Sequence, residues 1–165
     1  MSLYHEVILP SPVGALKLVA DDTHLLAILW EGESLKDVGM RGELQSGSGS
    51  PVLALAEVQL REYFAGTRCD FDLPIRLWGT EFQVQVWEAL REIPYGTTWS
   101  YSKLAARIDR PRAVRAVGAA NGRNRIPIVV PCHRVIGASG DLTGFAGGMK
   151  AKVLLLGLEA KLLPH

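Results

Sequence analysis

One stretch of the chain, IVVPCHRVIG, places a cysteine, a histidine and an arginine side by side as Cys132, His133 and Arg134. A cysteine becomes a nucleophile when a nearby base, cation or helix N-terminus stabilises its thiolate. Neighbouring residues of a strand point to opposite faces, so His133 cannot simply reach back to Cys132 if a strand continues here. Either the chain turns sharply, as Pro131 and Gly137 allow, or a water bridges the imidazole and the thiol.

A base of this kind needs a third group that orients the imidazole and balances its charge. Carboxylates are scarce near this segment, because residues 93–165 contain only Asp109, Asp141 and Glu159. Glu159 lies among leucines in MKAKVLLLGLEAKL, and an acid in such surroundings is expected to be partly buried and therefore paired.

Other interpretations of these residues remain open from local chemistry alone. Most free cysteines are buried structural thiols, and the histidine can be an ordinary core or surface residue. A zinc site is a third alternative, but Cys69, His5, His24 and His165 do not supply a recognisable ligand spacing. We expect no metal and no cofactor, and we expect Cys69 to be structural.

The charge of the chain is divided unevenly along its length. Residues 1–92 hold 7 Lys or Arg and 14 Asp or Glu, whereas residues 93–165 hold 11 and 3. Six arginines fall between positions 107 and 125, where Asp109 is the only acid. This asymmetry indicates that the second half faces an anionic partner, with nucleic acid as the leading candidate.

Composition also limits the class of protein. At 165 residues, with 48% hydrophobic and 21% charged residues, the chain fits a globular protein with one core or two small lobes. It has no apolar run of the roughly 20 residues that cross a bilayer, and no secretory leader is recognisable. With two cysteines expected to be free thiols, we predict a cytoplasmic protein without a membrane partner.

The elements that must position these residues can be outlined from periodicity. Short strands are expected within the first thirty residues, followed by a mobile Gly/Ser loop at 42–51 and an amphipathic helix at 52–64. The helix should bury Leu53, Ala56, Leu60 and Phe64, and CDFDLPIRLW (69–78) is a further candidate strand at an edge, because it contains a proline.

The second half reads as helical. Thr80 and Gln83 fit a capping box, and a buried stripe of Phe82, Val86, Leu90 and Ile93 follows. SYSKLAARI and a second helix starting around Arg112 are joined by a tight turn, an arrangement similar to a helix-turn-helix. We therefore predict an α+β fold: a small N-terminal α/β lobe with a short antiparallel sheet (1–78), and a mostly helical C-terminal domain containing a helix-turn-helix (79–165).

Three blocks of the second half, IPYGTTWSYSKLAARI, RAVGAANGRNRIPIVVPCHRVIGASGDLTGFAGG and LLLGLE, resemble the O6-alkylguanine-DNA alkyltransferases, also called methylated-DNA–protein-cysteine methyltransferases. The match runs from about Gly79 to Glu159, and PCHRV is its most specific motif. The N-terminal lobe resembles the family in its size, its opening hairpin with SPVG and its YFAG segment.

The resemblance implies DNA repair by irreversible transfer of one alkyl group to Cys132, from O6-alkylguanine and also from O4-methylthymine in duplex DNA. His133 would act as the base through a bridging water, and Glu159 would orient His133. The partner would be double-stranded DNA that carries alkylated bases. The protein would act as a monomer that inactivates itself.

The same resemblance implies a set of DNA contacts in the minor groove. Arg115 would enter the base stack in place of the flipped nucleotide, and Tyr101 would crowd a phosphate to promote flipping. Arg112, Ala116 and Asn121 would also contact the DNA. The small residues of this helix fit close approach to DNA, but they fit close helix packing equally well.

The implied base pocket contains Tyr101, Asn124, Pro127, Val135, Phe145 and Ala146. Asn124 would link the recognition helix to the active-site segment, the carbonyls of Cys132 and Val135 would accept from the guanine amine, and the Ala146 amide would donate to O6. The family usually has tyrosine where this chain has Phe145, which leaves the choice of alkyl groups in doubt.

Two rival functions differ in their products. A thiol hydrolase would turn over an ester or amide, but the arginine-rich helix would then have no task. A helix-turn-helix regulator would bind DNA as a dimer, sequence-specifically, without any covalent change. Only alkyl transfer explains the Cys-His-Arg run and the charge asymmetry together.

Overall fold

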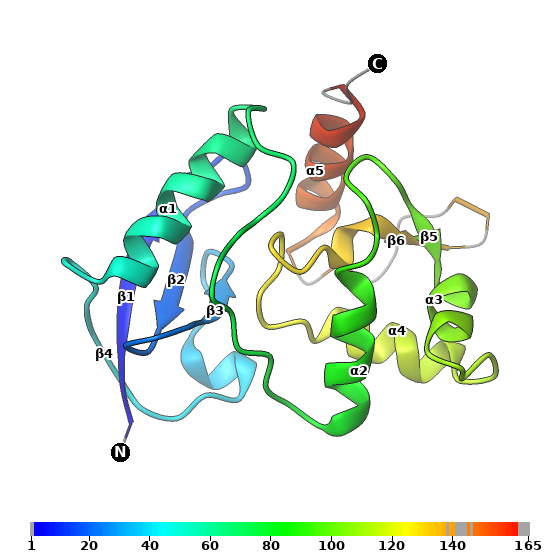
Figure 1. Cartoon of the computed structure of the whole chain (residues 1–165), viewed down its shortest axis with the longest axis horizontal. Helices are drawn as coiled ribbons and strands as arrows, with labels where there is room; N and C mark the ends of the chain where they lie inside the picture. Colours follow the sequence, from blue (N-terminus) through cyan, green and yellow to red (C-terminus); the bar gives the residue numbers. More distant parts are fainter. Residues whose placement is uncertain (1, 138, 141–144, 146, 162–165) are drawn as a thin grey trace. The chain divides into compact units, whose positions relative to one another are not determined.

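Four strands form the sheet of the first of two structural units, Met1–Leu77, in this computed structural model. The structure describes residues 2–137, 139–140, 145 and 147–161. The strands β1 (Leu3–Leu9), β2 (Leu16–Ala20), β3 (Leu25–Leu29) and β4 (Glu43–Ser46) lie in the order β3-β2-β1-β4 (Figure 1). The β1–β2 and β2–β3 pairs are antiparallel, as predicted, and β4 adds a parallel edge beside β1.

The helix α1 (Pro51–Phe64) covers the sheet of this unit and closes its core. It begins where the sequence allows a cap: Ser50 accepts from the Leu53 amide at 3.3 Å, and a proline occupies the first turn. Leu53, Ala56 and Leu60 are fully buried, as their spacing predicts, whereas Phe64 is only half-buried.

Two local predictions for this unit were wrong. The 42–51 segment is not a loop throughout, because Glu43–Ser46 forms β4; a short 3-10 helix, Leu35–Val38, precedes it. The 69–78 segment is not a strand and keeps one bridge, between Leu25 and Ile75. Pro74 has no amide hydrogen to extend a ladder, and the Gln59 side chain instead bonds both backbone groups of Asp72.

The second unit, Trp78–His165, is built from helices around the active-site segment. Its elements are α2 (Glu81–Leu90), β5 (Trp99–Ser100), α3 (Tyr101–Arg107), α4 (Val114–Gly122), the 3-10 turn η2 (Cys132–Arg134), β6 (Val135–Ile136) and α5 (Met149–Lys161). The capping box at the start of α2 is present, with Thr80 and Gln83 each accepting the other's amide hydrogen. Val86, Leu90 and Ile93 are buried as predicted, and Phe82 is half-buried.

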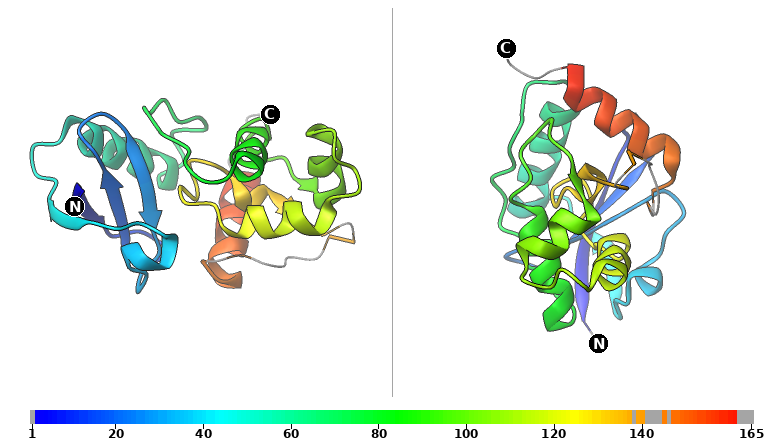
Figure 2. Two further views of the ribbon diagram at one scale, coloured as in Figure 1. Left: turned by 90° about the horizontal axis from the view of Figure 1, so that it is seen from below. Right: turned by 90° about the vertical axis from the view of Figure 1, so that its right-hand side faces the viewer.

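The helices α3 and α4 form the predicted helix-turn-helix, and both pack against α2 (Figure 2). α4 begins at Val114 rather than around Arg112. The residues before it form a turn, in which Asp109 has a left-handed φ of 58° and the Ala113 amide donates to the Arg110 carbonyl at 2.9 Å. Arg112 therefore lies in the turn and not on the helix.

Two contacts hold these elements together. The Trp87 indole donates to the Ala120 carbonyl at 2.8 Å and so joins α2 to α4. The short β5 pairs with β6 in parallel, through Trp99–Val135 and Ser100–Ile136, so the start of α3 lies beside the end of the Cys132 turn. Over the described part of the chain, none of the helices has the length and apolar character needed to cross a membrane.

Candidate active site

Cys132, His133 and Arg134 form one tight turn, η2, and all three side chains are buried. The turn is closed by the Arg134 amide, which donates to the Pro131 carbonyl at 3.0 Å. Pro131 has φ −82° and ψ 64°, and the Cys132 amide donates back to the Val130 carbonyl at 2.8 Å. The chain therefore turns sharply at this point, as Pro131 allows.

The segment before the turn is held in an unusual conformation. Ile128 has a φ of 75°, which a β-branched residue rarely adopts. Asn124 stabilises this segment: its amide nitrogen donates to the Val130 carbonyl at 2.7 Å, and its oxygen accepts from the Ile126 amide at 3.0 Å. Asn124 thus joins the end of α4 to the segment that carries Cys132, the position that the resemblance implied for it.

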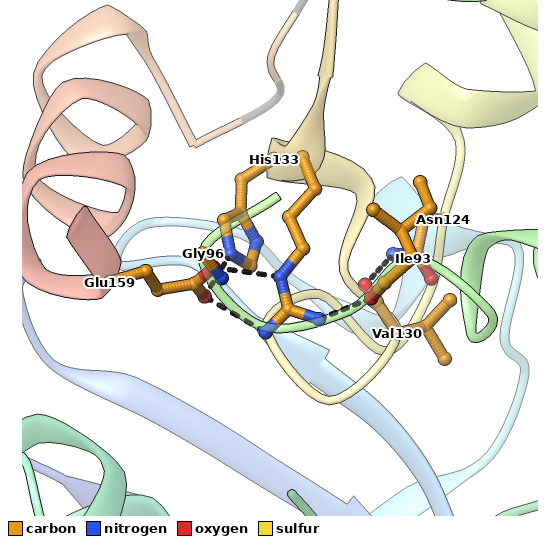
Figure 3. Close-up of polar contacts among 7 residues, drawn as sticks. Ile93, Gly96, Asn124, Val130, His133 and Glu159 are labelled. Carbon is orange, nitrogen blue, oxygen red and sulfur yellow. Dashed lines mark hydrogen bonds and ion pairs between the residues drawn. The ribbon is translucent and has the colours of Figure 1, made fainter. Parts of the chain in front are cut away.

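Glu159, on α5, contacts His133, which lies 26 positions earlier in the chain (Figure 3). The distance between His133 Nε2 and Glu159 Oε2 is 2.7 Å, and both side chains are at most 1% exposed. The same carboxylate accepts from Arg134 Nε at 2.7 Å, from Arg134 Nη2 at 3.0 Å and from the Gly96 amide at 3.2 Å. Burial by itself would raise the pKa of Glu159, but the hydrogen bonds and charges of His133 and Arg134 hold that pKa well below its usual value.

Glu159 is therefore an anion, which assigns the proton of the neutral imidazole to Nε2. Burial lowers the pKa of His133 and outweighs the opposing effect of Glu159, so the imidazole is neutral at pH 7. The other ring nitrogen, Nδ1, is buried and has no hydrogen-bond partner among the described residues. This unprotonated nitrogen belongs to the residue next to Cys132 and is chemically able to accept a proton.

The thiol of Cys132 is also buried, at 5% exposure. Burial raises its pKa to about 11, although a hydrogen bond with Asn124 and the charge of Lys152 act in the opposite direction. At neutral pH the sulfur therefore carries its proton and needs a base before it can attack an electrophile.

The expected pocket residues differ in exposure. Tyr101 opens α3 and is half-buried, as is Phe145, while Pro127 and Val135 are buried. The Val135 carbonyl already accepts from Lys152 Nζ at 2.7 Å, and the Cys132 carbonyl accepts from the Asn121 amide nitrogen at 3.4 Å. The Cys132 carbonyl also accepts from the Val135 amide, so both of its lone pairs are already engaged. Ala146 lies outside the described residues.

The expected DNA-contact residues are not all on the surface. Arg112, Arg115 and Ala116 are exposed. Asn121 is 1% exposed, and its side chain points inward to the Cys132 carbonyl, so this geometry is incompatible with a direct contact to DNA. It faces inward because Ala120 and Asn121 lie on the side of α4 that packs toward α2 and the active-site turn.

Sequence reasoning missed two buried cations, Arg134 and Lys152. Lys152 is 0% exposed and lies with Leu155 and Glu159 on one side of α5, since these residues are spaced by three and seven positions. That spacing was readable in the sequence, whereas the pairing of Arg134 with Glu159 was not. Within the residues described, no group of three or more His, Cys, Asp or Glu side chains could hold a metal ion.

Two family models match the chain. "6-O-methylguanine DNA methyltransferase, ribonuclease-like domain" covers residues 3–77, and "6-O-methylguanine DNA methyltransferase, DNA binding domain" covers residues 81–161. The constitutive methylated-DNA–protein-cysteine methyltransferase of Bacillus subtilis is 44% identical over 150 residues, which are 90% of this chain and 91% of that protein. The enzyme of the same name from Mycolicibacterium paratuberculosis is 46% identical over 155 residues, 93% and 91% of the two chains.

Solved structures agree with these matches. The crystal structure of Mycobacterium tuberculosis OGT in complex with DNA has a TM-score of 0.85 and 42% sequence identity, and the match covers 99% of this chain and 96% of that one. The match to this solved structure extends over both units of the chain. The chain belongs to the methylated-DNA–protein-cysteine methyltransferase family.

Proposed function

We propose that this protein repairs DNA by moving the methyl group of O6-methylguanine, in duplex DNA, onto the sulfur of Cys132. The observation that carries the proposal is the geometry around His133. Its Nε2 is held by the Glu159 anion at 2.7 Å, and its free Nδ1 is buried one residue from a protonated thiol. The family to which the chain belongs, and the names of its relatives, support the same chemistry.

The reaction balances without a cofactor. The Nδ1 atom of His133 takes the thiol proton through a bridging water, and the sulfur attacks the methyl carbon. A sulfur–carbon bond forms as the bond between that carbon and O6 breaks. The electron pair of the broken bond remains on the guanine. The proton then passes from the imidazolium to the guanine, so that an unmodified base and a methyl thioether are left.

The thioether makes the protein a single-use reagent. No residue described near Cys132 could remove the methyl group from a neutral thioether, because the group expelled would be a thiolate, which leaves poorly from an unactivated methyl carbon. One molecule therefore repairs one base. We extend the proposal to O4-methylthymine, because its methyl group is attached to an equivalent enol oxygen.

The target base must leave the helix stack to reach a sulfur that is only 5% exposed. We propose that α3 and α4 approach the minor groove, with Arg115 entering the stack at the position of the flipped nucleotide and Tyr101 pressing on its phosphate. Both cysteines are free thiols, and the chemistry needs Cys132 reduced. We therefore propose that the protein acts in the reducing cytoplasm. We also propose that it acts as a monomer, because one Cys132 and one His133 suffice for one transfer.

The test is incubation of the protein with a duplex that contains one O6-methylguanine. We expect intact mass to increase once, by the mass of one methylene group, and peptide mapping to place the change on Cys132. Cys132→Ser should take up nothing, whereas the matched variant Cys69→Ser should react like the wild type. An unmodified Cys132 after complete incubation, or catalytic turnover of the duplex, would rule the proposal out.

A further inference from the structure

Arg134 is buried beside the nucleophile and its base, and the transfer of a methyl group to sulfur does not use its guanidinium directly. Its side chain is 8% exposed. It donates to Glu159 through Nε and Nη2, at 2.7 and 3.0 Å, and through Nη1 to the Ile93 carbonyl at 2.7 Å. Paired contacts of this kind fix both the position and the orientation of a carboxylate.

The carboxylate that Arg134 holds is the one that orients His133. Two residues of η2, His133 and Arg134, contact Glu159 (Figure 3). The 93–96 turn also contacts it, through the Gly96 amide. Arg134 also donates to that turn, at Ile93. A single guanidinium therefore joins three segments, α5, η2 and the 93–96 turn, around the partner of the base.

The charges of this cluster decide whether the base is free. With a neutral His133, the Arg134 cation and the Glu159 anion cancel, so a proton added to the imidazole leaves a net buried positive charge. Without Arg134, the neutral imidazole would lie against an isolated buried anion, and the added proton would then neutralise the pair. Burial favours the neutral arrangement in each case, because charges are costly away from water.

We propose that Arg134 is a positioning residue of the methyl-transfer reaction, which keeps Glu159 ionised and in place so that His133 rests as a neutral base with Nδ1 available to the thiol. This inference rests on the proposed function. The other groups that face the cluster are Cys132 on η2, Lys152 on α5 and Tyr95 in the 93–96 turn, whose ring lies 5.6 Å from the guanidinium carbon. The charge of Lys152 also opposes protonation of His133, and it is the same in every variant below.

The experiment measures single-turnover methylation of Cys132 as a function of pH in full-length protein. In Arg134→Gln, the midpoint of the acidic limb should move upward by about one pH unit or more, the usual effect of a nearby charge. At pH values below the midpoints of both the wild type and Arg134→Gln, the variant should then react about tenfold or more slowly than the wild type. At pH values above both midpoints, the two rates should be equal. Arg134→Lys, which keeps the charge, should have a midpoint close to that of the wild type.

A double variant checks the charge argument directly. Arg134→Gln combined with Glu159→Gln removes the anion with the cation, so its midpoint should return toward the wild-type value even though its rate is lower. Arg91→Gln, which changes an exposed arginine of an ion pair with Glu88, is the matched control and should leave the profile unchanged. An equal fractional loss at every pH in Arg134→Gln, or the same shift in Arg134→Lys, would show a purely structural role and overturn the inference.

A second measurement needs no variant and no activity. Nitrogen NMR of the histidine side chains in the wild type should show His133 with Nε2 protonated and Nδ1 unprotonated at neutral pH. An imidazolium signal for His133 would contradict the inference even if Arg134→Gln failed to fold. Failure of the wild type to accept a methyl group would instead reject the proposed function, and the NMR result would still stand on its own.

Discussion

At the scale of single residues, the site combines a poor nucleophile with a free base. The Cys132 thiol has a pKa raised by burial to about 11, so only a minute fraction is ionised at neutral pH. His133 has one nitrogen committed to Glu159 and one with no partner among the described side chains. The same burial that protects the sulfur from adventitious reaction makes it depend on this imidazole.

This dependence predicts how His133→Ala behaves with pH. At neutral pH, loss of a general base should lower the rate of Cys132 methylation by about 10²–10⁴-fold. The deficit should shrink as the pH rises toward about 11, because the thiol then ionises without a base. Single-turnover rates by mass spectrometry would measure this, with His5→Ala as the control. A deficit of the same size at every pH would show that His133 does not act as the base.

At the scale of elements, α5 contributes to the site through Glu159, and α4 contributes through its exposed face. Glu159 is 1% exposed and ties α5 to η2 and the 93–96 turn. Arg115 and Ala116 lie exposed on α4, whereas Val117 and Ala120 on the same helix are buried. α5 therefore connects the segments of the candidate site, and α4 exposes an arginine to solvent.

For α5, we expect Glu159→Gln to lower the free energy of unfolding by about 3–5 kcal/mol at neutral pH, because it leaves the Arg134 cation buried without its anion. The folded-state pKa of Glu159 lies below its ordinary value of 4.5, so its contribution is present above that pH and is lost as the pH falls through the folded pKa. The difference between the two proteins should thus shrink in acid.

Denaturant unfolding at several pH values would measure this difference. Glu92→Gln is the matched control, since Glu92 pairs with Arg107 at the surface, and it should cost less than about 1 kcal/mol. Equal effects of the two substitutions would contradict the structural role given to Glu159.

For α4, we expect Arg115→Ala to slow repair of a duplex by about tenfold or more, because flipping a base costs a few kcal/mol and the vacated stack would lose its filling side chain. Reaction with free O6-benzylguanine, which needs no flipping, should be almost unchanged. Arg91→Ala, an exposed arginine on the neighbouring segment after α2, serves as the control. Similar losses on both substrates would argue against an insertion role.

At the scale of the whole molecule, the two units differ in charge. Residues 1–77 contain 6 Lys or Arg and 11 Asp or Glu, whereas residues 78–165 contain 12 and 6. An anionic duplex is therefore attracted to the second unit, where the helix-turn-helix lies, and repelled by the first.

This asymmetry predicts the salt dependence of binding to duplex DNA. The logarithm of the association constant should fall linearly with the logarithm of salt concentration, with a slope of about −0.9 for each phosphate neutralised. Arg112→Ala should make that negative slope shallower by about one, because one phosphate contact is lost. Arg61→Ala, on α1, should leave the slope unchanged. Fluorescence anisotropy at several salt concentrations would test both variants, and a flat response in the wild type would exclude a phosphate-contacting face.

Local signals predicted most of what lies close together in the chain. The Thr80–Gln83 capping box, the two short helices after Ser100 and the turn at Pro131 each depend on residues a few positions apart, and the structure contains all three. The α+β class and the family were recognisable for the same reason, because their motifs are contiguous. The spacing of apolar residues that marks strands and helices can be recognised in the sequence without knowledge of any tertiary contact.

Errors arose where a distant partner decides the outcome. Residues 43–46 form a strand because they pair in parallel with β1. Residues 69–78 do not form a strand, because the Gln59 side chain bonds the backbone of Asp72. Asn121 was expected at the DNA surface, but packing of α4 turns it inward. Each of these contacts joins residues that the chain separates by eleven or more positions.

The sequence by itself determined the helix-turn-helix and the family, and it singled out Cys132, His133 and Glu159 as the candidate reactive residues, since adjacent or regularly spaced side chains carry that information. The tertiary structure alone decided that Arg134 and Glu159 meet at 2.7 Å, that the thiol is buried and that Nδ1 of His133 has no partner among the residues whose structure is described. Burial and long-range pairing set the protonation states of the site, and neither can be obtained from the order of the residues.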